Sequence, residues 1–151
     1  MKPKKPKGVR MGDRYIFAID PGSEKSAFVL YDSHDKVILE KGIEENEDIM
    51  ELVVSYDYNI LAIEMIASYG MPVGKEVFQT CVWIGRFDPN QQAQLVYRKD
   101  VKMHLCGSMR AKDANIRQAL IDKLGKEATK GVKRDEWSAL AVAVYVSENN
   151  A

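Results

Sequence analysis

Tyr15–Gly22, with the sequence Tyr-Ile-Phe-Ala-Ile-Asp-Pro-Gly, is the stretch from which the fold of this chain can be worked out. Its apolar residues lead directly into a carboxylate, Asp20, and a Pro-Gly turn follows. An apolar run bounded by turn residues is typical of a β-strand buried on both faces. Ligands of open α/β sheets bind beyond the carboxyl ends of strands. Asp20 is therefore a candidate ligand-holding residue, with a turn-starting Asp as the alternative.

The same pattern returns at 59–64, where an apolar run ends in Glu64. A helix predicted over 44–56 separates the two strands, and a strand that follows such a crossover runs parallel to its partner. If the strands are neighbours, Asp20 and Glu64 share one sheet edge. Two carboxylates that close repel, and one pKa rises unless a cation bridges them. A divalent metal ion with oxygen ligands resolves that conflict.

The remaining periodicity predicts an α/β domain. Strands at 26–31 and 36–41 form a hairpin that the first strand joins as a meander. Further elements are helices at 75–87 and 114–124, a strand at 94–98, one or two helical turns at 100–105, and a final helix from 135 to 146 that lies flat on the sheet.

One basic loop, one acid beside it and one aromatic residue are candidates for ligand contact. Arg110 and Lys112 stand in a Gly-Ser loop before a helix N-terminus, which predicts an anion site. The loop does not match a nucleotide-binding P-loop. Asp113 fits a metal-supporting acid or a simple helix-start acid equally well. Tyr69 is placed either to stack on a nucleobase or to pack under its loop.

Composition indicates a globular protein, with 46% hydrophobic and 29% charged residues among 151. No apolar run is long enough for a membrane span, and two cysteines without CxxC spacing fit a reducing compartment, so we expect a cytoplasmic protein. Residues 1–14 carry a net charge of +5 and predict a basic, disordered arm, which either helps to bind nucleic-acid phosphates or is simply a solvated segment. Residues 15–151 then form a single domain.

Taken in order, four segments resemble the RuvC-like branch of the RNase H-like nucleases, with the closest likeness to phage and prophage proteins. The likeness extends from about residue 15 to 145. It implies a mixed five-stranded sheet flanked by helices, and a Mg-dependent endonuclease that cuts four-way (Holliday) DNA junctions, commonly as a homodimer. The segments are Ile-Asp-Pro-Gly at 19–22, Ala-Ile-Glu at 62–64, Gly107 to Gln118, and Asp-Glu-Trp-Ser-Ala-Leu-Ala at 135–141.

By that resemblance, Asp20, Glu64 and Asp135 are the catalytic carboxylates that hold Mg, for which Mn can substitute. Lys112 matches a family lysine near the DNA backbone, and Tyr69 lies near the aromatic that some members use to open the junction. The expected partner is branched DNA. The expected DNA-binding residues are Tyr69, Arg110, Lys112, Lys130, Lys133 and Arg134.

The chain departs from the family at one position. Bacterial RuvC enzymes end with two acids three residues apart before an Ala-Leu-Ala run, and here Ser138 takes the second place. Glu136 and Asp113 are the candidates for a fourth ligand, although Glu136 points about 100° away from Asp135 on a helix.

Two hypotheses follow. The first is a junction endonuclease in recombination, repair or phage DNA processing. The alternative, motivated by Ser138, is a catalytically weakened module that binds branched DNA. An ATP-handling relative of the same sheet topology is disfavoured, because those folds need two such domains and 151 residues supply one.

Overall fold

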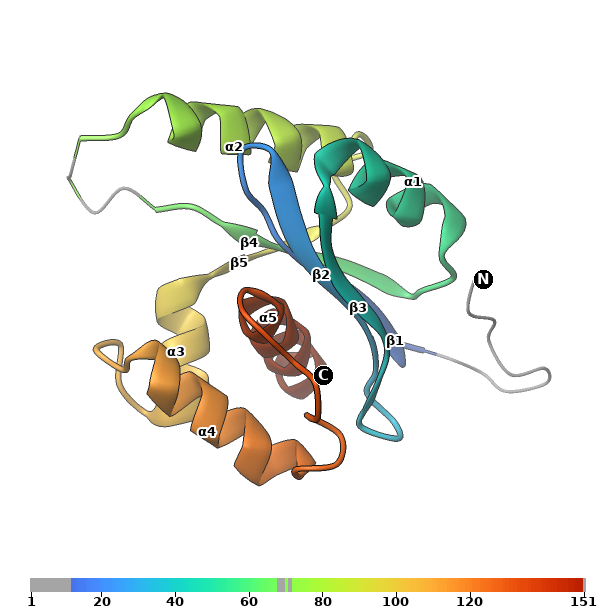
Figure 1. Ribbon diagram of the computed structural model, residues 1–151, viewed down its shortest axis with the longest axis vertical. Coiled ribbons are helices and arrows are strands. Elements are labelled where there is room, and N and C mark those ends of the chain that lie inside the picture. Colours follow the sequence, from blue (N-terminus) through green and yellow to red (C-terminus); the bar gives the residue numbers. More distant parts are fainter. Residues whose placement is uncertain (1–11, 68–69, 71, 151) are drawn as a thin grey trace.

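The computed structural model describes residues 12–67, 70 and 72–150 (Figure 1). Within them, no helix combines the length and the apolar character that crossing a membrane requires. The elements in chain order are β1 (Tyr15–Asp20), β2 (Lys25–Asp32), β3 (Val37–Glu45), α1 (Asn46–Ser55), β4 (Ile60–Met65), α2 (Lys75–Phe87), β5 (Gln94–Tyr97), α3 (Arg98–Cys106), α4 (Asp113–Leu124) and α5 (Glu136–Asn149).

The strands form one five-stranded mixed sheet in the order β3-β2-β1-β4-β5. β1, β2 and β3 are an antiparallel meander. β4 returns beside β1 in parallel, and β5 pairs in parallel with β4. The predicted α/β class and the mixed sheet are confirmed. The carboxyl ends of β1, β4 and β5 consequently meet at one edge of the sheet.

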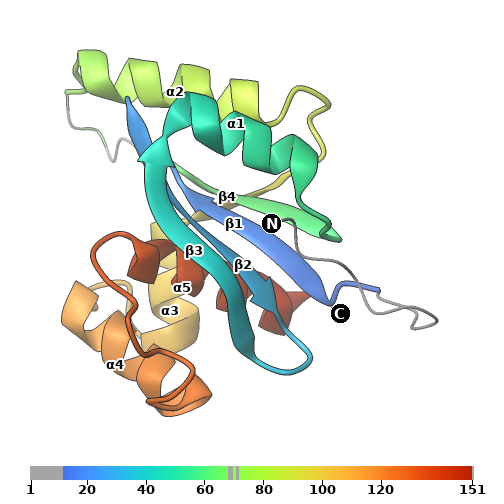
Figure 2. The ribbon, with the colours of Figure 1, turned by 45° about the vertical axis from the view of Figure 1, so that its right-hand side comes forward.

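Helices cover both faces of the sheet. α1 and α2 lie on one face, and α3, α4 and α5 lie on the other (Figures 1 and 2). β1 is apolar throughout because each face has its own core. Phe17 and Ile19 pack with α1 and α2, whereas Ile16 and Ala18 pack with α5. The predicted position of the last helix, flat on the sheet, is confirmed.

Two boundaries differ from the sequence-based prediction. β3 continues to Glu45, so the acidic residues Glu44 and Glu45 pair with β2 as strand residues, and α1 begins at the fully buried Asn46. α3 is a continuous helix of nine residues that begins directly after β5. Arg98, which the sequence placed at the end of a strand, is therefore the first residue of a helix.

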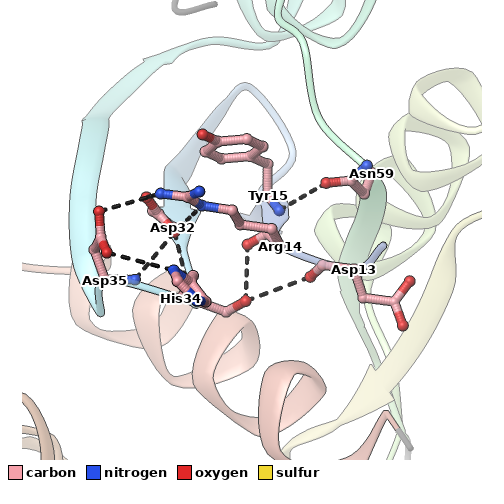
Figure 3. Close-up of polar contacts among 8 residues, drawn as sticks. Asp13, Arg14, Tyr15, Asp32, His34, Asp35 and Asn59 are labelled. Atoms are coloured by element: carbon pink, nitrogen blue, oxygen red, sulfur yellow. Dashed lines mark hydrogen bonds and ion pairs between the residues drawn. The ribbon is translucent and has the colours of Figure 1, made fainter. Parts of the chain in front are cut away.

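A partly buried ion pair joins Arg14, which directly precedes β1, to Asp32 at the end of β2. Arg14 donates from Nε and Nη2 to the two carboxylate oxygens of Asp32, both at 2.8 Å (Figure 3). Backbone N–H groups of His34 and Asp35 donate to Asp32 as well. The first eleven residues of the predicted arm lie outside the described residues, whereas Arg14 is held in this folded network.

Candidate active site

Asp20 and Glu64 are the end residues of two adjacent rows of side chains. Even-numbered residues of β1 and β4 pack toward α5, and Asp20 and Glu64 continue these rows at the strand ends. Ile19 of β1 is in register with Ile63 of β4. The structure thus brings the two carboxylates together on the α5 face of one sheet edge, as the sequence predicted.

Asp135 completes the acidic group from a third element. It is the residue that precedes the first turn of α5, which packs against β1 and β4. The negative charge of Asp135 acts on both strand-end acids and contributes to raising the pKa of Asp20 and the pKa of Glu64. The three carboxylates that the family resemblance singled out therefore lie near enough to act on one another electrostatically.

The electrostatics of Asp20 are those of a crowded, dehydrated carboxyl group. Burial is the largest cause that raises the pKa of Asp20 to about 8, and the negative charges of Glu64 and Asp135 add to it. Arg98 and the Ser138 hydroxyl act in the opposite direction. Burial likewise raises the pKa of Glu64, although Arg98 opposes it. Perturbed carboxyl groups of this kind concentrate at functional sites.

The turn that follows Asp20 is locked by a closed set of hydrogen bonds. The Gly22 N–H donates to Ser26 Oγ at 3.1 Å, Ser26 Oγ donates to Asn46 Oδ1 at 2.6 Å, and Asn46 Nδ2 donates to the Gly22 carbonyl at 3.0 Å. Ser26 and Asn46 are both buried. The backbone that presents Asp20 is consequently fixed from two neighbouring elements, β2 and α1.

Arg98 is a cation placed among these acids. Its Nη1 lies 3.5 Å from Glu64 Oε1 and donates to Ser138 Oγ at 3.3 Å. Its Nη2 donates to Asp113 Oδ1. Burial alone would lower the pKa of Arg98, but Glu64 and Asp113 outweigh it and raise the pKa. The guanidinium group is therefore permanently charged in this position.

A small cavity of about 60 Å³ opens beside this group. Its polar lining comes from β4, α3, α4 and the start of α5, so the residues that meet there are far apart in the sequence. The charged and hydroxyl residues that line it are Glu64, Arg98, Asp113, Arg117, Arg134, Asp135 and Ser138.

The donor chemistry of Asp20, Glu64 and Asp135 fits a hard divalent cation, because carboxylate oxygens are the ligands that Mg²⁺ and Mn²⁺ prefer. The three carboxylates nevertheless stand apart. In the described part of the chain, no three acidic, His or Cys side chains are close enough to hold a metal ion together.

Glu136 does not join the group. Its buried carboxylate accepts from Lys41 Nζ and from the Lys133 backbone N–H, both at 3.1 Å, which commits it to a contact with β3. Asp113 does lie beside the site, where it is bound to Arg98 and its side chain is 77% exposed. Of the two fourth-ligand candidates, the structure therefore places only Asp113 near Glu64.

The predicted DNA-binding residues divide into two groups. Arg110 and Lys112 are exposed in the loop between α3 and α4, and Arg134 lines the cavity. Lys133 is exposed beside Arg134. Lys130 instead lines a separate groove along β3. Tyr69 lies outside the described residues.

Sequence reasoning missed three residues that shape the site. Arg98 could have been found, because it directly follows a third parallel strand whose carboxyl end lies at the same edge. Lys102, one turn further along α3, also acts on Glu64 electrostatically. Asn46 could not have been found from local pattern, because its partner Gly22 is distant in the sequence and only the fold brings them together.

Comparisons with known proteins identify the fold. No protein-family model matches the chain, and no curated protein matches it. Solved structures do. Thermus thermophilus RuvC matches with a TM-score of 0.65 and 16% identity, over 87% of this chain and 92% of that one. T. thermophilus RuvC in complex with a Holliday junction substrate matches with a TM-score of 0.67 and 15% identity, over 87% of this chain and 92% of that one. The yeast mitochondrial Holliday junction resolvase Ydc2 matches with a TM-score of 0.58 and 10% identity, over 90% of this chain and 80% of that one. The chain has the RNase H-like fold of RuvC.

Proposed function

We propose that this protein is a divalent-metal-dependent endonuclease that hydrolyses DNA phosphodiesters at four-way or other branched junctions. The observation that carries the proposal is the gathering of Asp20, Glu64 and Asp135 at one sheet edge, in a fold shared with junction resolvases. Mg²⁺ is the expected metal ion, with Mn²⁺ as a substitute.

In this proposal the metal supplies Lewis-acid stabilisation of charge at the scissile phosphate. The protein supplies the placement of the carboxylates and the basic residues that contact DNA. Asp20 and Glu64 are held on adjacent strands, and Asp135 is held at the start of α5, so the fold fixes the backbone that carries each carboxylate. Arg110 and Lys112, at the N-terminal end of α4, are suited to contact backbone phosphates.

A homodimer is the expected assembly. Phe78 and Val82 stand one turn apart on α2 and are 61% and 53% exposed, so two large apolar side chains lie together on the surface of this helix. A second copy that covered this face of α2 would allow two active sites to address the two symmetric strands of a four-way junction.

The test uses the purified full chain with three labelled substrates: a synthetic four-way junction, a duplex and a single strand, each with Mg²⁺ or Mn²⁺. We expect symmetric cuts in the junction, and at least a hundredfold loss of cutting in Asp20→Asn. Asp48→Asn, an exposed acid on α1, is the matched control and should cut normally. Equal cutting of all three substrates would reject junction specificity.

The alternative is a module that binds branched DNA without cutting it. The open spacing of the acids and the presence of Ser138 and Arg98 between them favour this reading. The same experiment separates the two functions, because tight junction binding without cleavage in either metal would support the binding module and contradict the nuclease.

A further inference from the structure

Two guanidinium groups line the small cavity beside the acids without a carboxylate partner of their own. Arg117 comes from α4, and Arg134 comes from the segment between α4 and α5. The third arginine of the lining, Arg98, is already bound to Glu64 and Asp113. In the described part of the chain, neither Arg117 nor Arg134 forms an ion pair or a side-chain hydrogen bond. Their N–H donors are therefore available to an oxygen-rich ligand.

The Trp137 ring holds the first of these two guanidinium groups. The guanidinium carbon of Arg117 lies 5.5 Å from the centre of the Trp137 ring, within the range of a cation–π contact. Trp137 is the second residue of α5, is half-buried, and packs against the core on the α5 face of the sheet. Arg117 is therefore kept at the cavity by a ring that is itself fixed.

Trp137 also holds the backbone of the second arginine. Its N–H donates to the Arg134 carbonyl oxygen at 3.2 Å. Arg134 has a φ of 51°, in the left-handed region that residues other than glycine seldom adopt. Backbone strain of this kind persists where the surrounding structure enforces it, and it concentrates at ligand-binding sites. One residue thus contacts Arg117 through its ring and Arg134 through its main chain.

The size and charge of the cavity suit one group of a larger ligand. Its volume of about 60 Å³ is far below the roughly 300–1,000 Å³ of sites that enclose a whole small molecule. Its lining carries three carboxylates, Glu64, Asp113 and Asp135, against three arginines, so no excess of positive charge would draw in a free anion. A phosphate group that its own strand already holds in place needs only local donors, and guanidinium groups match phosphate oxygens.

Building on the proposed function, we propose that Arg117 and Arg134 form a clamp for one phosphate of the DNA backbone, and that Trp137 positions both. A strand that reaches Glu64 and Asp135 passes this cavity, because both acids line it. The clamped phosphate is a neighbour of the phosphate that is cut. Contacts of this kind set the register of the strand over the acids and carry no sequence preference.

The experiment measures fluorescence anisotropy of a labelled four-way junction with the purified full chain in EDTA, so that binding is observed without cutting. Arg117→Met and Arg134→Met should each weaken binding about fivefold and lower the slope of log affinity against log salt by about 1, as loss of one phosphate contact does. Lys36→Met is the matched control, because it removes the same charge from the separate groove along β3. Equal changes in the control and the arginine variants, or no change in either arginine variant, would overturn the clamp.

The positioning role of Trp137 is tested by variants that keep every charge. Trp137→Leu should weaken junction binding about threefold, whereas Trp137→Phe, which keeps an aromatic ring, should bind nearly as the wild type does. In the Trp137→Leu background, Arg117→Met should have a smaller effect than it has alone, because the two residues act together. Full additivity of the two changes would contradict the positioning role.

Two further measurements separate the clamp from other outcomes. Calorimetry with inorganic phosphate should show no binding, and saturable phosphate binding that Arg117→Met abolishes would reveal a free-anion site and overturn the DNA clamp. Junction cleavage in Mg²⁺ is measured separately. Binding that depends on Arg117 and Arg134 without any cleavage would support the clamp and contradict the nuclease, whereas cleavage that neither arginine affects would contradict the clamp alone.

Discussion

Asn46 and Gly22 are joined by a hydrogen bond in which Asn46 Nδ2 donates to the Gly22 carbonyl oxygen at 3.0 Å. Asn46 is the first residue of α1 and is fully buried. Gly22 lies two residues after Asp20, in the turn that ends β1. A helix on one face of the sheet therefore fixes the backbone of an acid that points to the other face.

Asn46→Ala should lower the free energy of unfolding by about 1–3 kcal/mol, because it leaves the buried hydroxyl of Ser26 and the carbonyl of Gly22 without their partner. Urea unfolding measures this change. Asn90→Ala, in an exposed turn, is the control and should be nearly neutral. Equal stability of the two variants would show that the network contributes nothing.

Gly22→Ala should destabilise the protein by roughly 1–3 kcal/mol, because a Cβ at this position would lie 2.2 Å from the Lys25 carbonyl oxygen. The matched substitution is Gly85→Ala in α2, where a Cβ meets nothing within 4 Å. That change should stabilise the helix by about 0.5–1 kcal/mol. Thermal unfolding of both variants checks the opposite signs, and a shift of the same sign in both would contradict the turn's steric requirement.

The surroundings of Asp32 predict that the folded protein loses stability as the pH falls. Burial would raise the pKa of Asp32, but hydrogen bonds from Arg14, Asp35 and His34 outweigh it and lower the pKa (Figure 3). The folded protein therefore binds fewer protons at this site than the unfolded chain does. Stability from this group is present at neutral pH and is lost as the pH falls below the usual Asp value of 3.8.

Asp32→Asn should accordingly melt several degrees below the wild type at pH 7, and the gap should narrow as the pH approaches 3. Melting temperatures measured across this range provide the check. A gap that stays constant with pH would mean that the ionised form of Asp32 is not what stabilises the fold.

The neighbouring acids Asp135 and Glu136 should have separate roles. Asp135→Asn should weaken Mn²⁺ binding by about tenfold or more with little effect on folding, because Asp135 is exposed and its charge faces the site. Glu136→Gln should leave Mn²⁺ binding intact and destabilise the fold by about 3 kcal/mol, because it breaks a buried ion pair with Lys41. Metal titration and urea unfolding of each variant test this division, and the reverse result would reassign the ligand.

Lys112→Ala should weaken junction binding and reduce the slope of log affinity against log salt by about 1, as loss of one phosphate contact does. Lys130→Ala is the comparison, because Lys130 lines the groove along β3 and not the cavity beside Glu64. We expect its slope to change less. Fluorescence anisotropy over a range of salt concentrations measures both, and equal changes would place the DNA across both surfaces.

Much of the fold was predictable because its signals are local. Apolar runs that end in Asp20 and Glu64 are strands, and the helix before the second strand predicts that it runs parallel to its partner. The two acids meet because β4 lies beside β1, which the sequence analysis stated only as a condition. The limits of α1 and α3 were less predictable. Glu44 and Glu45 have the composition of a helix start, yet pairing with β2 keeps them in a strand.

The sequence by itself determined the strands, the helix crossover that precedes the second acid-ended strand, and the acid at the end of each of these two strands, because apolar runs and turn residues lie close together in the chain. The tertiary structure decided that these two strands are neighbours in the order β3-β2-β1-β4-β5. Only the tertiary structure decided which charges meet. It bound Glu136 to Lys41, and it placed Arg98 between Glu64 and Ser138. The physical reason is that an ion pair depends on distance in space, which packing of helices against the sheet sets and no local pattern records.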